Sequence, residues 1–167
     1  MVRVISCIFA KNQKARMTRR IEDEIQSNKF RSEYHKAALN IFLAAQWITA
    51  HTAPIFKKYN LTGQQYNVLR ILRGRHPDPC TLLSVRERML DKMSDVSRII
   101  ERLRVAGYVE RSSCSEDRRA VDIKISDKGL ELLDAMKVEE EAMDSVMKNL
   151  TLEEAKELND LLDKLRD

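Results

Sequence analysis

The chain has 167 residues, of which 34% are charged and 5% are aromatic, with 4 Gly and 3 Pro; this predicts one mostly helical domain, with or without a helical extension, that can bury a core without disulfides. Its cysteines, Cys7, Cys80 and Cys114, are too few and too scattered for a disulfide framework or a metal motif, so a reducing compartment is expected. The net charge of +4 does not by itself indicate a nucleic-acid partner, and no apolar run approaches the roughly 20 residues that span a bilayer.

Charge is distributed unevenly along the chain. Residues 127–167 hold 6 Lys and Arg against 13 Asp and Glu, a net charge of −7, whereas residues 1–126 carry a net charge of +11. A basic body with an acidic helical end indicates two surfaces with different partners, and a basic surface suits a polyanion. The alternative is a chance asymmetry on solvated helices.

Residues 1–29 show no pattern of a packed element. The apolar stretch 2–10 is short, and the basic stretch 11–20 follows it, which reverses the order found in a secretory signal. We therefore expect residues 1–29 to form a poorly ordered arm, with Met17 as an alternative start, and we expect a cytoplasmic protein.

Residues 30–52 have the spacing of a helix with two apolar sides. The main face holds Tyr34, Ala37, Ala38, Ile41, Phe42, Ala45 and Ile48. A second stripe holds Leu39, Leu43 and Trp47. Because a helix that is apolar on two sides is buried on two sides, one side is expected to meet another subunit. Pro54 is expected to break or kink this helix.

A second helix and a loop are predicted next. Thr62 and Gln65 form a capping-box pattern at the start of the helix, and Gly74 ends it. Residues 75–80 contain two prolines and are expected to form a loop, which a short helix over residues 82–89 follows.

The helix predicted over residues 95–106 has a regular apolar stripe. Ser94 is expected to cap it, and Gly107 stands where a left-handed residue ends a helix. The stripe follows the spacing i, i+3, i+4, i+7 and consists of Val96, Ile99, Ile100 and Leu103.

A β-hairpin and two further helices complete the prediction. Residues 108–111 and 120–125 are expected to form strands around a polar, charged tip at residues 112–119. Ser126 caps a helix whose apolar face holds Leu130, Leu133, Met136, Met143, Val146 and Met147. Thr151 and Glu154 form a second capping box, which opens a last helix with Leu152, Ala155, Leu158, Leu161, Leu162 and Leu165.

This order of elements predicts a mainly α protein with a small β-hairpin wing. Residues 59–126 describe a winged helix-turn-helix DNA-binding lobe, in which the second helix enters the major groove. Residues 30–58 and 127–167 describe N- and C-terminal helices for dimerisation.

The face of the 95–106 helix opposite its apolar stripe is polar and basic. Arg98 and Arg102 lie four residues apart and repel each other, although Glu101 can offset some of that repulsion. Phosphates or guanine edges would neutralise such a face, and its candidate DNA-binding residues are Ser94, Asp95, Ser97, Arg98 and Arg102. The alternative is an ordinary solvated face.

The hairpin tip carries a second candidate site. Arg118 and Arg119 suit a narrow minor groove, where arginine is favoured electrostatically, and Asp117 can hold Arg119 in place. The alternative is a surface salt-bridged turn. Cys114 on the same tip lies near arginines that could lower its pKa, or it is an inert surface thiol.

Three runs of sequence together resemble the MarR family of bacterial regulators. They are residues 93–98 (MSDVSR), 107–111 (GYVER) and 117–129 (DRRAVDIKISDKG), and the resemblance extends from about residue 30 to the end of the chain. It implies a dimer built from the first and last helices, which binds pseudo-palindromic DNA as a repressor and is released by a small ligand or by oxidation.

Carried over by position, the resemblance assigns roles to individual residues. Ser94, Asp95, Ser97 and Arg98 would lie near bases, and Arg119 would enter the minor groove. The helix before the recognition helix departs from the family pattern, because residues 82–86 (LLSVR) replace its common polar start. That departure affects the contacts that position this helix on the DNA backbone.

The remaining residues favour a binding protein over an enzyme. His35, His51 and His76 are scattered, so no metal site or cofactor is expected, and no nucleophile–base set is present. The aromatic residues Phe42, Trp47, Tyr59 and Tyr66 are either core residues or the lining of a candidate effector cleft. The competing hypotheses are a winged-helix module for protein–protein contact, without DNA binding, and a small enzyme.

Overall fold

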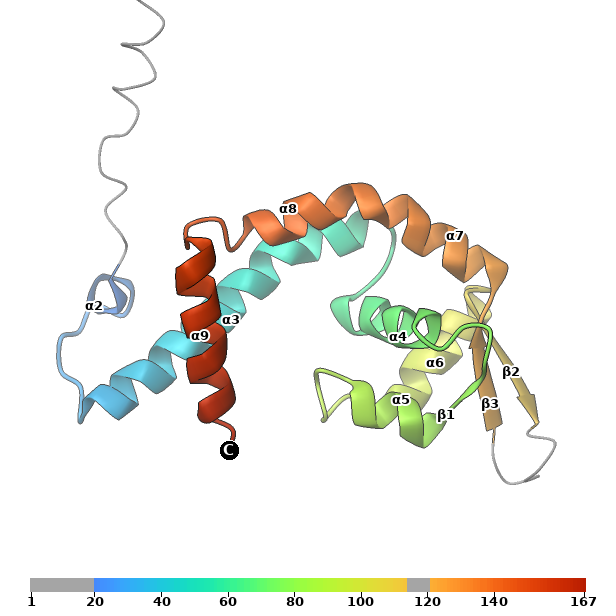
Figure 1. Ribbon diagram of the computed structural model, residues 1–167, viewed down its shortest axis with the longest axis horizontal. Helices are drawn as coiled ribbons and strands as arrows, with labels where there is room; N and C mark the ends of the chain where they lie inside the picture. The colour runs from blue at the N-terminus through green and yellow to red at the C-terminus, as the bar shows by residue number, and fades with distance from the viewer. Residues whose placement is uncertain (1–19, 114–120) are drawn as a thin grey trace, which may run out of the picture. The chain divides into compact units, whose positions relative to one another are not determined.

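Figure 1 shows the computed structural model of the chain, which describes residues 20–113 and 121–167. The chain divides into two units, Met1–Gln46 and Trp47–Asp167. The boundary falls inside helix α3 (Glu33–Lys58). Most of the predicted arm and the tip of the predicted wing lie outside the described residues.

The described part of the first unit contains a short helix, α2 (Ile21–Glu24), before α3. Ile21 is buried, and the ammonium of Lys36 lies 2.7 Å from a carboxylate oxygen of Glu22 and 5.4 Å from the ring centre of Phe30. An apolar side chain and an ion pair therefore connect this segment to α3, and the poor order expected for residues 1–29 stays a prediction.

Helix α3 is longer than predicted, and no residue in it is buried. Pro54 does not end the helix, which continues to Lys58. Proline removes one backbone donor, and packing of the Phe56 ring 5.1 Å from the Tyr66 ring centre helps to offset that loss. The apolar side chains Phe42 and Trp47 are 67% and 43% exposed in the single chain.

The second unit contains a lobe of three helices and a three-stranded sheet (Figure 1). Its helices are α4 (Gly63–Arg73), α5 (Leu82–Arg88) and α6 (Val96–Val105). Its strands are β1 (Cys80–Thr81), β2 (Val109–Ser113) and β3 (Val121–Ile125). The predicted winged helix-turn-helix order is confirmed.

The sheet has the order β1-β3-β2, and both pairings are antiparallel. Val109 pairs with Ile125, and Arg111 pairs with Ile123, which forms the predicted hairpin. Strand β1 is an addition to the prediction: Cys80 pairs with Ile123 on the other edge of β3, and its side chain is buried. Two residues are too few to show a strand pattern in the sequence.

The core of the lobe lies between the helices and the sheet. Its buried side chains alternate along β3 and follow the predicted stripe of α6, as the periodicity indicated. The fully buried members include Val68, Leu69, Leu72, Val85, Met89, Ile100, Leu103, Ile123 and Met136. This packing presents the opposite face of α6 to solvent.

The sequence predicts one helix after Ser126, but the structure has two helices there, separated by a 3₁₀ segment. A 3₁₀ segment, η1 (Met136–Glu139), separates α7 (Asp127–Ala135) from α8 (Glu140–Ser145). Glu139 forms an ion pair with Lys58 and accepts a hydrogen bond from the Tyr59 hydroxyl at 3.2 Å. These bonds to the end of α3 accompany the tighter turn at η1.

The last helix, α9 (Leu152–Lys164), begins at the predicted capping box of Thr151 and Glu154. None of its residues is buried, and Leu161 is 65% exposed. Within residues 20–113 and 121–167, no helix combines the length and the apolar character needed to cross a membrane.

Candidate nucleic-acid interface

The N-terminus of α6 is held by a carboxylate. Asp95, rather than the predicted Ser94, is the cap residue, and its side chain accepts a hydrogen bond from the backbone N–H of Arg98 at 3.1 Å. Ser94 is one residue too early, and its hydroxyl donates to Asp91 at 2.7 Å instead. The cap fixes the first turn of α6, which carries the predicted base-reading residues.

The outer face of α6 presents hydroxyl and guanidinium groups to solvent. Ser97, Arg98 and Arg102 are exposed, whereas Ile100 and Leu103 on the inner face are fully buried. The predicted polar face therefore lies on one surface of the lobe, because the core fixes the rotation of the helix. A polyanion with a groove that admits a helix could contact this face without disturbing the core.

Glu101 divides the arginines near α6 into two groups. Its carboxylate binds the Arg104 guanidinium through two hydrogen bonds, of 2.8 and 3.0 Å, and lies 3.6 Å from Arg111. The hydrogen bond from Arg104, and then the charges of Arg104 and Arg111, hold the pKa of Glu101 below its usual value. Glu101 does not compensate Arg98 or Arg102, which make no ion pair within the described residues.

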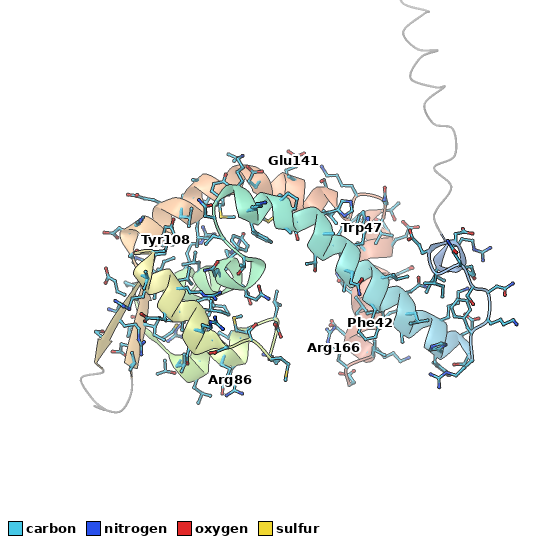
Figure 2. The ribbon with its side chains drawn as sticks, turned by 180° about the vertical axis from the view of Figure 1, so that it is seen from behind. Phe42, Trp47, Arg86, Tyr108, Glu141 and Arg166 are labelled. Carbon is cyan, nitrogen blue, oxygen red and sulfur yellow. The ribbon has the colours of Figure 1, made fainter. Side chains whose placement is uncertain are left out.

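Helix α5 adds basic side chains that are not among the predicted DNA-binding residues. Arg86 and Arg88 lie in its last turn and are exposed, and Figure 2 shows Arg86 at the outer side of the helix. At the start of α5, Leu82 and Leu83 are exposed, so the departure from a polar start places apolar side chains on the surface. In the sequence, Arg86 and Arg88 on either side of Glu87 indicate that this helix ends with basic side chains.

The wing can be followed only along its two strands. Asp117, Arg118, Arg119 and Cys114 lie outside the described residues, so their predicted roles rest on the sequence. Within the described residues, no group of three or more His, Cys, Asp and Glu side chains could hold a metal ion.

A cavity of about 670 Å³ lies between the end of α3, α4 and the turn before α6. Its wall includes the rings of Phe56 and Tyr66 and the side chain of Leu90. Two cations, Lys57 and Arg70, lie beside the apolar wall; Arg70 donates a hydrogen bond to the Tyr66 hydroxyl at 2.9 Å and lies 3.5 Å from Glu140. Such a lining suits an organic molecule with an aromatic body and a negative group.

The four aromatic residues predicted for an effector cleft are distributed differently. Tyr66 lines this cavity, but Tyr59 is turned to η1, where its hydroxyl bonds to Glu139. The Trp47 ring lies 4.3 Å from the His51 ring, and Phe42 belongs to the other unit. Phe56 is not among the predicted cleft residues, because Pro54 predicts a break or kink in the helix two residues before it.

Comparisons with known proteins agree on one family. Residues 59–120 match the family model described as MarR family. The transcriptional regulator MgrA of Staphylococcus aureus is 33% identical over 111 residues, which cover 66% of this chain and 74% of MgrA. The match to the regulator PecS of Dickeya dadantii is 29% identical and covers 47% of this chain and 48% of PecS.

Solved structures share the fold. A MarR transcription factor from Planctomyces limnophilus is 31% identical with a TM-score of 0.63, and the match covers 81% of this chain and 98% of that one. BpsR of Bordetella bronchiseptica, whose DNA binding is regulated by 6-hydroxynicotinic acid, is 26% identical with a TM-score of 0.70; the match covers 79% of this chain and 99% of BpsR.

Proposed function

Because the chain belongs to the MarR family of transcriptional regulators, we propose that it binds a pseudo-palindromic DNA operator as a homodimer and represses transcription. The observation that carries the proposal is the outer face of α6, where Arg98 and Arg102 have no acidic partner within the described residues. Two uncompensated cations on a rigid, capped helix suit phosphates and guanine edges.

Selection of bound fragments from a random DNA pool tests this proposal directly. We expect recovery of one motif with two-fold symmetry, followed by mobility shifts that weaken steeply as salt rises. Recovery of no motif, together with no mobility shift at low salt, would favour the protein–protein module instead. The same experiment gives the half-site and the spacing between half-sites.

We expect an obligate dimer. Helices α3 and α9 have no buried residue in the single chain, although both carry apolar stripes. A second copy would remove that apolar surface from water. Light scattering at micromolar concentration should report twice the chain mass of 19.4 kDa. A monodisperse monomer under those conditions would contradict the dimer.

Arg119→Ala in the wing is expected to weaken binding to every DNA sequence without altering the fold. Loss of a backbone or minor-groove contact lowers affinity generally and reduces the slope of log affinity against log salt by about one. Titrations of operator DNA at several salt concentrations measure both quantities. An unchanged affinity and slope would exclude the wing from DNA binding.

We further propose that a small organic anion in the cavity beside Tyr66 releases the DNA. The cavity has the volume of a ligand site, a largely apolar lining and two cations at its wall, Lys57 and Arg70. Regulation of DNA binding by 6-hydroxynicotinic acid in BpsR supports a ligand of this class. A panel of aromatic carboxylates, scored by loss of the mobility shift, tests the proposal.

A further inference from the structure

The turn between α5 and α6 belongs both to the cavity wall and to the DNA-reading unit. Met89, Leu90 and Asp91 line the cavity, and α6 begins five residues after Asp91. Met89 is fully buried, whereas the Leu90 side chain is 87% exposed. The turn is therefore anchored in the core at its first residue and open to solvent at the next one.

A side chain of α4 holds the exposed part of this turn. The backbone N–H of Leu90 donates to the side-chain oxygen of Asn67 at 3.0 Å. Within residues 20–113 and 121–167, no other hydrogen bond joins the turn to α4. Asn67 is half-buried and lines the same cavity. It therefore fixes the position of the turn relative to the cavity.

Asp91 extends this connection to the start of α6. Its carboxylate accepts one hydrogen bond from the backbone N–H of Met93 at 3.0 Å and another from the Ser94 hydroxyl at 2.7 Å. The backbone N–H of Ser94 also donates to the Asp91 carbonyl at 3.3 Å. Asp95, which caps α6, follows directly. The hydrogen bonds thus run from α4 through the turn to the cap of α6.

We infer that Asn67 and Asp91 are positioning residues for DNA recognition, and that they couple the cavity to the recognition helix. This inference rests on the proposed DNA binding. Neither side chain needs to touch DNA. Asn67 holds the turn against α4, and Asp91 holds Ser94, so the first turn of α6 is presented at a fixed angle. Reading a base edge needs this precision, whereas a general attraction to phosphates does not.

Affinity for the operator and affinity for unrelated DNA, measured separately, distinguish a positioning role from a merely structural one. Asn67→Ala should lower affinity for the operator roughly fivefold, the equivalent of one hydrogen bond, and leave affinity for unrelated DNA unchanged. Gln64→Ala is the matched control, because Gln64 lies on the same helix and cavity wall and makes no side-chain hydrogen bond within the described residues. The control should leave both affinities unchanged.

Variants of the turn itself provide a second test that does not touch α4. Asp91→Ala should reduce the ratio of operator affinity to unrelated-DNA affinity more than Asp91→Asn does, since the amide keeps an acceptor for the Met93 N–H. An unchanged ratio of operator affinity to unrelated-DNA affinity in Asp91→Ala, or equal losses in Asp91→Ala and Asp91→Asn, would contradict the connection.

Filling the cavity from its opposite wall tests the coupling. Ala53 on α3 lines the cavity, and Ala53→Trp should lower operator affinity by displacing the turn. The same substitution should cost less in the Asn67→Ala background, where the turn is already released. Equal losses in both backgrounds, or no loss in either, would contradict the coupling.

The outcomes for the parent protein and for its variants have different meanings. A parent protein that fails to bind any DNA would contradict the proposed function. A parent protein that binds its operator, with Asn67→Ala indistinguishable from Gln64→Ala in both affinities, would overturn only the positioning role.

Discussion

Replacing Gly129 with alanine is expected to lower the free energy of unfolding by about 3 kcal/mol, the upper part of the range for overpacking. An added Cβ would lie 2.4 Å from the backbone oxygen of Tyr108 and 2.7 Å from a side-chain carbon of Ile125. A backbone oxygen cannot rotate away, so α7 would have to move off the start of β2. The Ser-x-x-Gly pattern at residues 126–129 is therefore a packing requirement.

Urea unfolding at a fixed protein concentration measures this loss, and the thermal midpoint should fall by roughly 6–12 °C for a chain of this size. Gly74→Ala is the matched control, because a Cβ there would meet carbonyl oxygens at 3.5 Å and the backbone is helical. That control should change stability by less than about 1 kcal/mol. Equal stability of the two variants would mean that α7 can shift without cost.

Replacing Arg98 with alanine is expected to change the sequence preference of the protein as well as its affinity. A bidentate contact between arginine and guanine contributes about 1–3 kcal/mol of discrimination against the other bases. Arg98 lies on the exposed face of the first turns of α6, and its own backbone N–H bonds to the Asp95 cap. The variant should therefore lose selectivity at one base pair in each half-site.

Libraries of singly substituted operators measure this change. In a dimer, the lost selectivity should occur at two symmetric positions, with the half-site centres about 10 base pairs apart. Arg104→Ala is the comparison, because Glu101 already engages that guanidinium. If every operator weakens by the same factor in Arg98→Ala, the residue binds only phosphate. Bound sites without two-fold symmetry would contradict the dimeric docking.

Local signals in the sequence predicted the fold well. The capping boxes that begin at Thr62 and Thr151 and the cap at Ser126 all form, because each needs only a side chain and a backbone three residues on. Gly107 has a φ of +81°, the left-handed conformation that its place after α6 predicted.

Features that depend on distant residues could not be predicted in the same way. Glu101 was expected to compensate arginines on its own helix face, but one of its partners is Arg111, on strand β2. Spacing along the chain does not reveal a partner that the fold brings close.

At the candidate interface, too, local features could be predicted from the sequence and contacts between distant residues could not. The exposed face of α6 follows from its buried stripe, so the positions of Ser97, Arg98 and Arg102 could be predicted from periodicity alone. The role of Asn67 could not, since its partner is a backbone N–H 23 residues later. Hydrogen bonds between a side chain and a distant backbone leave no pattern in the sequence.

The burial of Cys80 in the short edge strand β1 makes its thiol a reporter of local opening. It is 3% exposed, and it is the cysteine that the described residues contain. With Cys7 and Cys114 replaced by serine, a thiol reagent can react only when β1 separates from β3. The labelling rate then measures how often this edge of the sheet opens, which is a local equilibrium distinct from global unfolding. Followed with and without DNA, that rate would show whether binding at α6 damps the motion of the sheet.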